Sequence, residues 1–246
     1  MKHLSSLLLL GLLAGAGTAC GQGNSGGAPV GWVKLSADVP LRGLWSVYTE
    51  IETRQSNGNL SAQQLGRLGF RWNPTSTFSL TTGYVLAANE CIAIGDNVTT
   101  PEHRLYQEVA LSDASGRLRV GHRLRAEERW LRPAPEAAFQ FAPRLRYQLR
   151  LVVPLRSGGK LPVGGLFLVA ADEVFIGLGS RKDRNFLEEN RASAGLGYRM
   201  NRRTTVELAY LRQTQAAGAV GQALARNAVQ VSVAITTPNS LALARR

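Results

Sequence analysis

The feature that most constrains the fold of this chain is a period-two alternation of apolar and polar residues, which recurs almost to the C-terminus. Residues 45–54 show it clearly, because Trp45 and Ile51 fall on one face and Glu50 on the other. Side chains alternate between the two faces of a strand, so the pattern predicts β-structure that is apolar on one side and polar on the other. The spacing typical of amphipathic helices is almost absent beyond the N-terminal segment.

Ten such segments are separated by turn-forming residues, and we predict a strand for each: residues 45–54, 64–72, 78–86, 103–111, 117–129, 144–151, 166–176, 189–198, 204–212 and 228–235. Residues 32–39 are a candidate eleventh strand. Short connections at 73–76, 113–116 and 201–203 alternate with longer ones at 87–102, 131–143 and 213–227. Tight turns at one end and long loops at the other are typical of outer-membrane barrels. An even count of ten would also return the chain to the end from which it began.

The N-terminal segment is typical of a secretory signal. Lys2 and His3 precede an apolar run at residues 4–13, and small residues follow at 14–19. Cleavage after residue 19 would leave Cys20 as the first residue of the mature chain and as a candidate for lipidation. We therefore predict a signal peptide at 1–19, a flexible Gly- and Ser-rich leader at 20–31, a β-barrel domain at 32–240 and a C-terminal tail at 241–246.

The polar face of the predicted strands is rich in arginine. The chain carries 29 basic and 17 acidic residues, a net charge of +12, and only four of the basic residues are lysine. A solvated face would use lysine as freely as arginine. A packed polar interior favours arginine, because its planar guanidinium pairs with carboxylates and is less costly to dehydrate than an ammonium group. We predict a charge ladder in the barrel interior, made of Glu50, Glu52, Arg54, Arg67, Arg71, Arg104, Glu108, Arg119, Arg123, Arg125, Glu127, Arg129, Arg144, Arg146, Arg150, Glu173, Glu189, Arg191 and Glu207.

The apolar face and the export signal favour a membrane barrel over a soluble sandwich, which would bury its apolar face and wet its polar one. Aromatic residues of the apolar face often fall near strand ends, as the two interfacial girdles of a membrane barrel require: Trp45, Trp72, Phe78, Tyr84, Tyr147, Tyr198 and Tyr210. The predicted fold class is thus an all-β, up-and-down antiparallel transmembrane barrel of about ten strands, with ten to twelve allowed.

These features predict a structural role, or a narrow channel that prefers anions, because the interior carries surplus positive charge. The alternatives are a lipid-acting outer-membrane enzyme and a soluble exported barrel that binds a small ligand. The enzyme has weak support, since His103 and His122 are the histidines of the mature chain, His122 shares a face with apolar residues, and no GxSxG motif is present. We expect no catalytic residues.

The sequence contains no pattern typical of a metal, cofactor or nucleic-acid site. Cys20 and Cys91 form no CxxC pair and no histidine cluster has ligand spacing, so we expect no metal site and no cofactor. The arginines alternate with apolar residues and with glutamates, which argues against a nucleic-acid partner despite the net charge. The expected partners are outer-membrane lipid and the barrel-assembly machinery, and the oligomeric state stays open.

The chain resembles the bacterial barrel family called domain of unknown function 2490 (DUF2490). The resemblance covers roughly residues 32–237 and is carried by motifs at 50–54, 64–71, 122–129, 144–146, 172–175, 189–198 and 210–211. Membership implies an outer-membrane barrel of a Gram-negative bacterium and supplies no established activity. One departure is the end of the chain, Leu-Ala-Leu-Ala-Arg-Arg at 241–246, where outer-membrane strands commonly finish on an aromatic residue.

Overall fold

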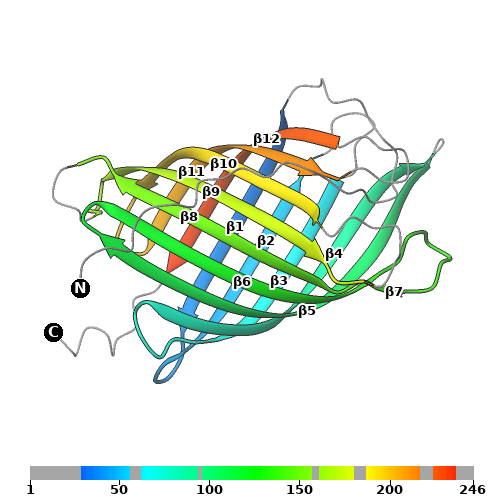
Figure 1. Cartoon of the computed structure of the whole chain (residues 1–246), viewed down its shortest axis with the longest axis horizontal. Helices are drawn as coiled ribbons and strands as arrows, with labels where there is room; N and C mark the ends of the chain where they lie inside the picture. The colour runs from blue at the N-terminus through cyan, green and yellow to red at the C-terminus, as the bar shows by residue number, and fades with distance from the viewer. Residues whose placement is uncertain are drawn as a thin grey trace.

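The structure is a computed structural model that describes residues 29–55, 62–93, 96–156, 161–179, 187–216 and 224–236. The predicted signal peptide, Cys20, most of the leader and the tail lie outside these ranges. The described part of the chain consists of strands and their connections (Figure 1). The strands are β1 (Val30–Pro40), β2 (Trp45–Arg54), β3 (Ala62–Trp72), β4 (Phe78–Ala93), β5 (Asp96–Ser115), β6 (Leu118–Leu131), β7 (Gln140–Phe141), β8 (Arg144–Pro154), β9 (Leu166–Gly177), β10 (Leu187–Arg199), β11 (Thr204–Gln215) and β12 (Leu224–Thr236). None of the described residues belongs to a helix long and apolar enough to span a bilayer.

The strands form one closed sheet. Each long strand pairs antiparallel with its neighbour in sequence, β5 pairs with β6, and β7 adds two residues beside the end of β6. The sheet closes where β1 meets β12, and these two strands run parallel, with Val30 opposite Ala228 and Asp38 opposite Thr236. The predicted all-β up-and-down barrel is confirmed. Without the two-residue β7, the described residues supply eleven strands, within the predicted range.

The strand that closes the barrel shows that the expectation of an even number of strands was wrong. The candidate eleventh strand at 32–39 forms as β1, beginning at Val30 inside the predicted leader, and it lies between β2 and β12. Successive antiparallel strands reverse direction, so the first and last of an odd number point the same way and can close a barrel only by a parallel pair. Val30 and Thr236 therefore lie at opposite ends of the barrel.

Two of the long connections predicted from sequence are shorter than expected. Instead of a loop at 87–102, β4 and β5 continue as one hairpin to the pair Ala93–Asp96, and it extends past the neighbouring strands (Figure 1). Likewise β11 reaches Gln215 and β12 begins at Leu224, inside the predicted loop at 213–227. Residues 87–93 are mostly small or polar, with weak apolar contrast between their faces, so the alternation did not indicate that the strand continues.

The opposite end of the barrel carries the tight turns. The β1–β2, β3–β4, β5–β6 and β10–β11 connections are each a few residues long. At the shortest of them, between β5 and β6, Gly116 has a φ of +59°, a left-handed conformation that glycine adopts without steric cost.

The two faces of the barrel wall differ as the alternation predicts. Large apolar side chains point outward on every long strand, and Ile51 and Leu68 are each 61% exposed. Charged side chains point inward, where Arg67, Arg125 and Glu127 are buried. The wall is therefore apolar outside and ionic inside, the reverse of a soluble globular domain.

Mid-strand glycines let one aromatic ring pack against the inner wall. Tyr106 of β5 is fully buried and lies against Gly69 of β3 and Gly83 of β4. A Cβ at Gly83 would lie 2.8 Å from Cε1 of that ring, and a Cβ at Gly69 would overlap its hydroxyl. With Leu65, Val85 and Ala87, this ring forms the apolar part of the interior on the β3–β5 side.

Candidate functional site

The register of the sheet places opposite charges directly across from one another inside the barrel. Glu50 of β2 is opposite Arg67 of β3, Glu108 of β5 opposite Arg125 of β6, and Glu127 of β6 opposite Arg144 of β8. Opposed residues have their Cβ atoms about 5 Å apart, so each guanidinium reaches its carboxylate without leaving its own wall position. Each of the three pairs makes an ion pair.

Shared carboxylates join these pairs into a network. Glu127 accepts from Arg144 Nε at 3.0 Å and from Arg146 Nη1 at 2.7 Å. Glu173 accepts from Arg146 Nε at 2.9 Å and from Arg123 Nη2 at 2.7 Å. Ion pairs extend this network in both directions, so that acidic and basic side chains alternate along one connected series. The series is Asp38, Arg71, Glu108, Arg123, Glu173, Arg146, Glu127, Arg144, Glu188, Arg129, Glu102 and Arg104.

Aromatic rings pack against the guanidinium faces. The Arg125 and Arg67 guanidinium carbons lie 4.9 and 5.5 Å from the Tyr106 ring centroid. Phe175 has Arg146 and Arg191 each at 4.5 Å. A planar cation stacks on a ring while its edge donates to carboxylates, so both surfaces of each guanidinium are used. This double use explains why the buried network is built from arginine.

Trp32 of β1 lies against two of these arginines. Its ring centroid is 4.4 Å from the guanidinium carbon of Arg54 and 5.2 Å from that of Arg191. Arg54 pairs with Glu52, and Arg191 with Glu189. This group fills the interior near the end where β1 begins.

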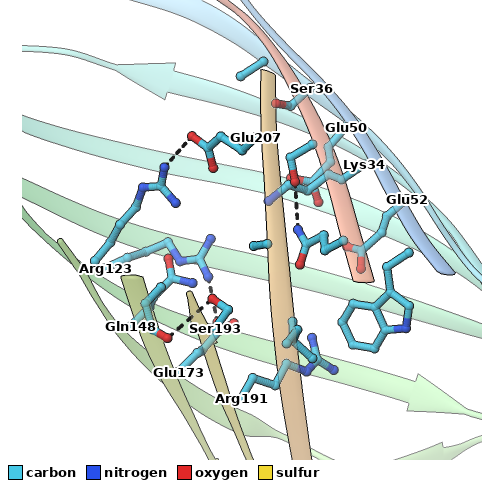
Figure 2. A pocket seen from close by; sticks show the side chains of 18 of the residues that line it. Lys34, Ser36, Glu50, Glu52, Arg123, Gln148, Glu173, Arg191, Ser193 and Glu207 are labelled. Atoms are coloured by element: carbon cyan, nitrogen blue, oxygen red, sulfur yellow. Dashed lines mark hydrogen bonds and ion pairs between the residues drawn. The ribbon is translucent and has the colours of Figure 1, made fainter. Parts of the chain in front are cut away.

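The network leaves a cavity of about 340 Å³, bordered mainly by β1–β3 and β8–β12. One part of its wall is small or hydroxyl-bearing: Ser36, Ala171, Ser193, Ala209, Ser232 and Ala234. Elsewhere it is charged, and Figure 2 shows Lys34 and Arg123 reaching into it from different sides. Side-chain exposure rises from 2% at Arg125, which does not line the cavity, to 24% at Arg123 and 36% at Arg150.

The lining is unbalanced in charge. Among the described residues it holds eight cationic side chains and four carboxylates, Glu50, Glu52, Glu173 and Glu207. Lys34 differs from the arginines because no carboxylate of the described residues lies within ion-pair distance of its ammonium group. It is opposite Glu52 in the register, but Glu52 pairs with Arg54 and Glu50 with Arg67. The cavity is thus a cationic, hydroxyl-lined space suited to an anion.

The structure brings eighteen of the nineteen residues of the predicted ladder into ion pairs inside the barrel. Arg119 is the exception: it lies near the turn after β5, is exposed, and has no ion pair among the described residues. Sequence analysis missed Asp38, Glu102, Glu188 and Lys34. Glu102 was assigned to a loop, and the residues of β1 were not counted, although Lys34, Ser36 and Asp38 alternate there with Val33, Leu35 and Ala37.

The histidines of the barrel face outward. His122 Nδ1 lies 2.8 Å from the Tyr147 hydroxyl, and His103 Nδ1 hydrogen-bonds to the Tyr84 hydroxyl. In the described ranges, no serine hydroxyl is hydrogen-bonded to either ring, and no three His, Cys, Asp or Glu side chains gather as a metal site. The candidate lipidation site, Cys20, lies outside the described residues.

Comparison with known proteins places the chain among uncharacterised relatives. Residues 30–223 match the family described as protein of unknown function (DUF2490). An uncharacterized protein of Methylorubrum extorquens is 30% identical over 179 residues, covering 71% of this chain and 73% of the relative. No solved structure matches.

Proposed function

The chain belongs to the DUF2490 family, and we propose that it is an outer-membrane barrel whose interior is a narrow, anion-preferring passage braced by buried ion pairs. Its proposed partners are outer-membrane lipid and the barrel-assembly machinery that would insert it. The proposal assigns it no catalytic residue and no cofactor. The observation that carries the proposal is the inverted wall, apolar outside and ionic inside.

The apolar outer face has the height that a bilayer needs. On β9, Leu166, Leu168, Val174 and Ile176 point outward along one strand. Ten residues at about 3.3 Å each, tilted by about 40°, span roughly 25 Å, which is the height of the apolar band of outer-membrane barrels. Asp172 interrupts this face, and its carboxylate accepts hydrogen bonds from Asn190 Nδ2 at 3.0 and 3.2 Å.

Outward aromatic residues gather near both ends of the wall. Trp45 and Phe70 stack with ring centroids 4.8 Å apart beside Trp72, close to the tight turns. Trp130 and Phe141 pack at 5.4 Å near the β6–β8 connection at the other end. Aromatic side chains favour membrane–water interfaces because their rings are apolar and their polar atoms can reach water.

The charge of the cavity supports the preference for anions. An excess of arginine and lysine in a confined polar lumen attracts anions and repels cations, as rings of basic residues do in anion pores. The remainder of the cross-section is filled by Tyr106, Val85 and the ion-pair network. The passage is therefore narrow.

The first experiment tests the barrel and its environment. Refolded mature chain should stay monodisperse only in detergent, and it should migrate differently on gels before and after boiling, because a closed barrel resists unfolding by detergent. A chain that is monomeric in plain buffer would contradict the membrane proposal and favour the soluble ligand-binding barrel instead.

The second experiment tests the preference for anions. In planar bilayers with a KCl gradient, the reversal potential of the wild type should indicate chloride preference, and Arg150→Glu should reduce or reverse it. Arg150 is suited to substitution because its side chain is the most exposed of the arginines that line the cavity. Arg212→Glu, on the outer face, is the matched control. Absence of conductance, or unchanged selectivity in Arg150→Glu, would contradict the channel and leave a structural barrel.

A further inference from the structure

The unbalanced charge of the cavity points to a specific ligand chemistry. We propose that it is a binding site for a small oxyanion with at least two negative charges, held by Lys34, Arg123 and Arg150. This inference shares its cavity with the proposed passage and depends on the proposed function in no other respect. Its physical basis is the excess of cations, the donors left without partners, and the size of the space.

The cavity offers donors that the protein's own acceptors do not occupy. Lys34 has no carboxylate within ion-pair distance among the described residues, and Arg123, whose side chain is 24% exposed, reaches the cavity while Nη2 pairs with Glu173. Arg150 is joined to Glu207 through Nη2 at 2.5 Å, so in the described part of the chain its remaining guanidinium donors have no carboxylate. A buried donor without a partner costs free energy, and a bound oxyanion would supply the missing acceptors.

Neutral donors complete the lining. Ser36, Ser193 and Ser232 present hydroxyls from β1, β10 and β12, and Gln148 adds an amide from β8. Hydroxyls and amides donate to oxygen without adding charge, so they suit an anion with several oxygens better than a spherical halide. Ala171 and Ala209 also line the cavity, and their small side chains leave space for a ligand beside these donors.

Size and charge together narrow the class of ligand. A volume of about 340 Å³ accommodates a compact anion. Three lining cations, Arg104, Arg146 and Arg191, pair with carboxylates behind the lining, so the uncompensated charge is centred on Lys34. An anion with several charged oxygens could contact Lys34 and the exposed edges of Arg123 and Arg150 together, which chloride could not. The class is thus small polyvalent oxyanions, such as phosphates and di- or tricarboxylates.

Inorganic pyrophosphate is a suitable probe of this class. In isothermal titration calorimetry on the refolded chain in detergent, at fixed ionic strength set with KCl, pyrophosphate should bind saturably at one site per chain. Lys34→Gln and Arg150→Gln should each weaken binding at least tenfold, whereas Lys34→Arg should stay within a few-fold of wild type and Arg212→Gln should have no effect. The heat-dependent gel shift confirms that each variant is folded.

Two results would overturn the site: no saturable heat above that of chloride, or pyrophosphate binding that is equal in Lys34→Gln, Arg150→Gln and wild type. Failure of the site is distinguishable from failure of the proposed function. A barrel that needs detergent and conducts anions but does not bind pyrophosphate contradicts the site alone. A chain that binds pyrophosphate through Lys34 but is monomeric in plain buffer contradicts the membrane passage alone.

Discussion

Glu127 shows at the scale of single residues how the interior depends on exact charge pairing. Its side chain is fully buried and accepts from both Arg144 and Arg146, while Arg125 Nη1 lies 4.0 Å away. Dehydrating these ions is unfavourable, and their mutual attraction offsets that cost only while every partner is present.

Glu127→Gln should therefore be severely destabilising. It leaves two guanidiniums without their shared carboxylate, and breaking a buried pair of this kind costs about 3–5 kcal/mol. Urea unfolding of the refolded barrel in detergent, followed by tryptophan fluorescence, measures the loss. Glu128→Gln, one residue along and facing outward, should change the free energy of unfolding by less than about 1 kcal/mol. Equal effects of the two substitutions would contradict the assigned faces of β6.

The Tyr106 hydroxyl gives a second residue-scale prediction. It is buried without a hydrogen-bond partner among the described residues, and it is the atom that a Cβ at Gly69 would meet first. Gly69→Ala should cost about 1–3 kcal/mol through overpacking, and Tyr106→Phe should recover much of that loss by removing the hydroxyl. Gly66→Ala is the control, because a Cβ there has open space. The same urea unfolding measures the wild type, the three single variants and the double variant, and an unchanged cost of Gly69→Ala in the Tyr106→Phe background would contradict this packing.

At the scale of elements, alternation predicted where strands lie better than where they end. Residues 45–54 form β2 with the predicted bounds, because hydrophobic contrast between its faces is strong along its whole length. The extension of β4 and β5 over residues 87–102 depends on pairing between the two strands, which a single-strand pattern does not reveal. Consequently Glu102, which binds Arg104 and Arg129 in that extension, was missing from the predicted ladder.

The parallel seam between β1 and β12 predicts a specific crosslink. Val33 and Val231 are partners in the register and both face outward. After Cys20 and Cys91 are replaced by serine, Val33→Cys with Val231→Cys should crosslink with a short bifunctional thiol reagent and alter the mobility of the unfolded chain. Val33→Cys with Ile235→Cys should not react, because four residues displace the second thiol by about 13 Å along the strand. Reaction of the displaced pair instead would contradict the eleven-strand closure.

For the whole molecule, the sequence was sufficient for the barrel and for the charged interior, but not for the cavity. Which faces point inward follows from period two, and the ladder follows from the identity of those residues. The empty space depends on the sum of side-chain volumes around the closed wall: large rings and arginines on β3–β6, small residues such as Ser193 and Ala209 on β10 and β11. That sum is fixed only once the number of strands and their register are known.

The odd strand number makes one prediction about the whole molecule in its proposed membrane. Because β1 and β12 are parallel, Pro29 and Thr236 lie at opposite ends of the barrel, and both are exposed. In cells expressing a chain without Cys20 and Cys91, a cysteine at position 29 should react with a bulky, membrane-impermeant maleimide, and a cysteine at 236 should react only after the outer membrane is opened. Position 29 shares its end with the longer connections, which face outward in outer-membrane barrels. Labelling of both cysteines in intact cells would contradict the opposite placement of the two ends, and labelling of 236 alone would reverse the orientation.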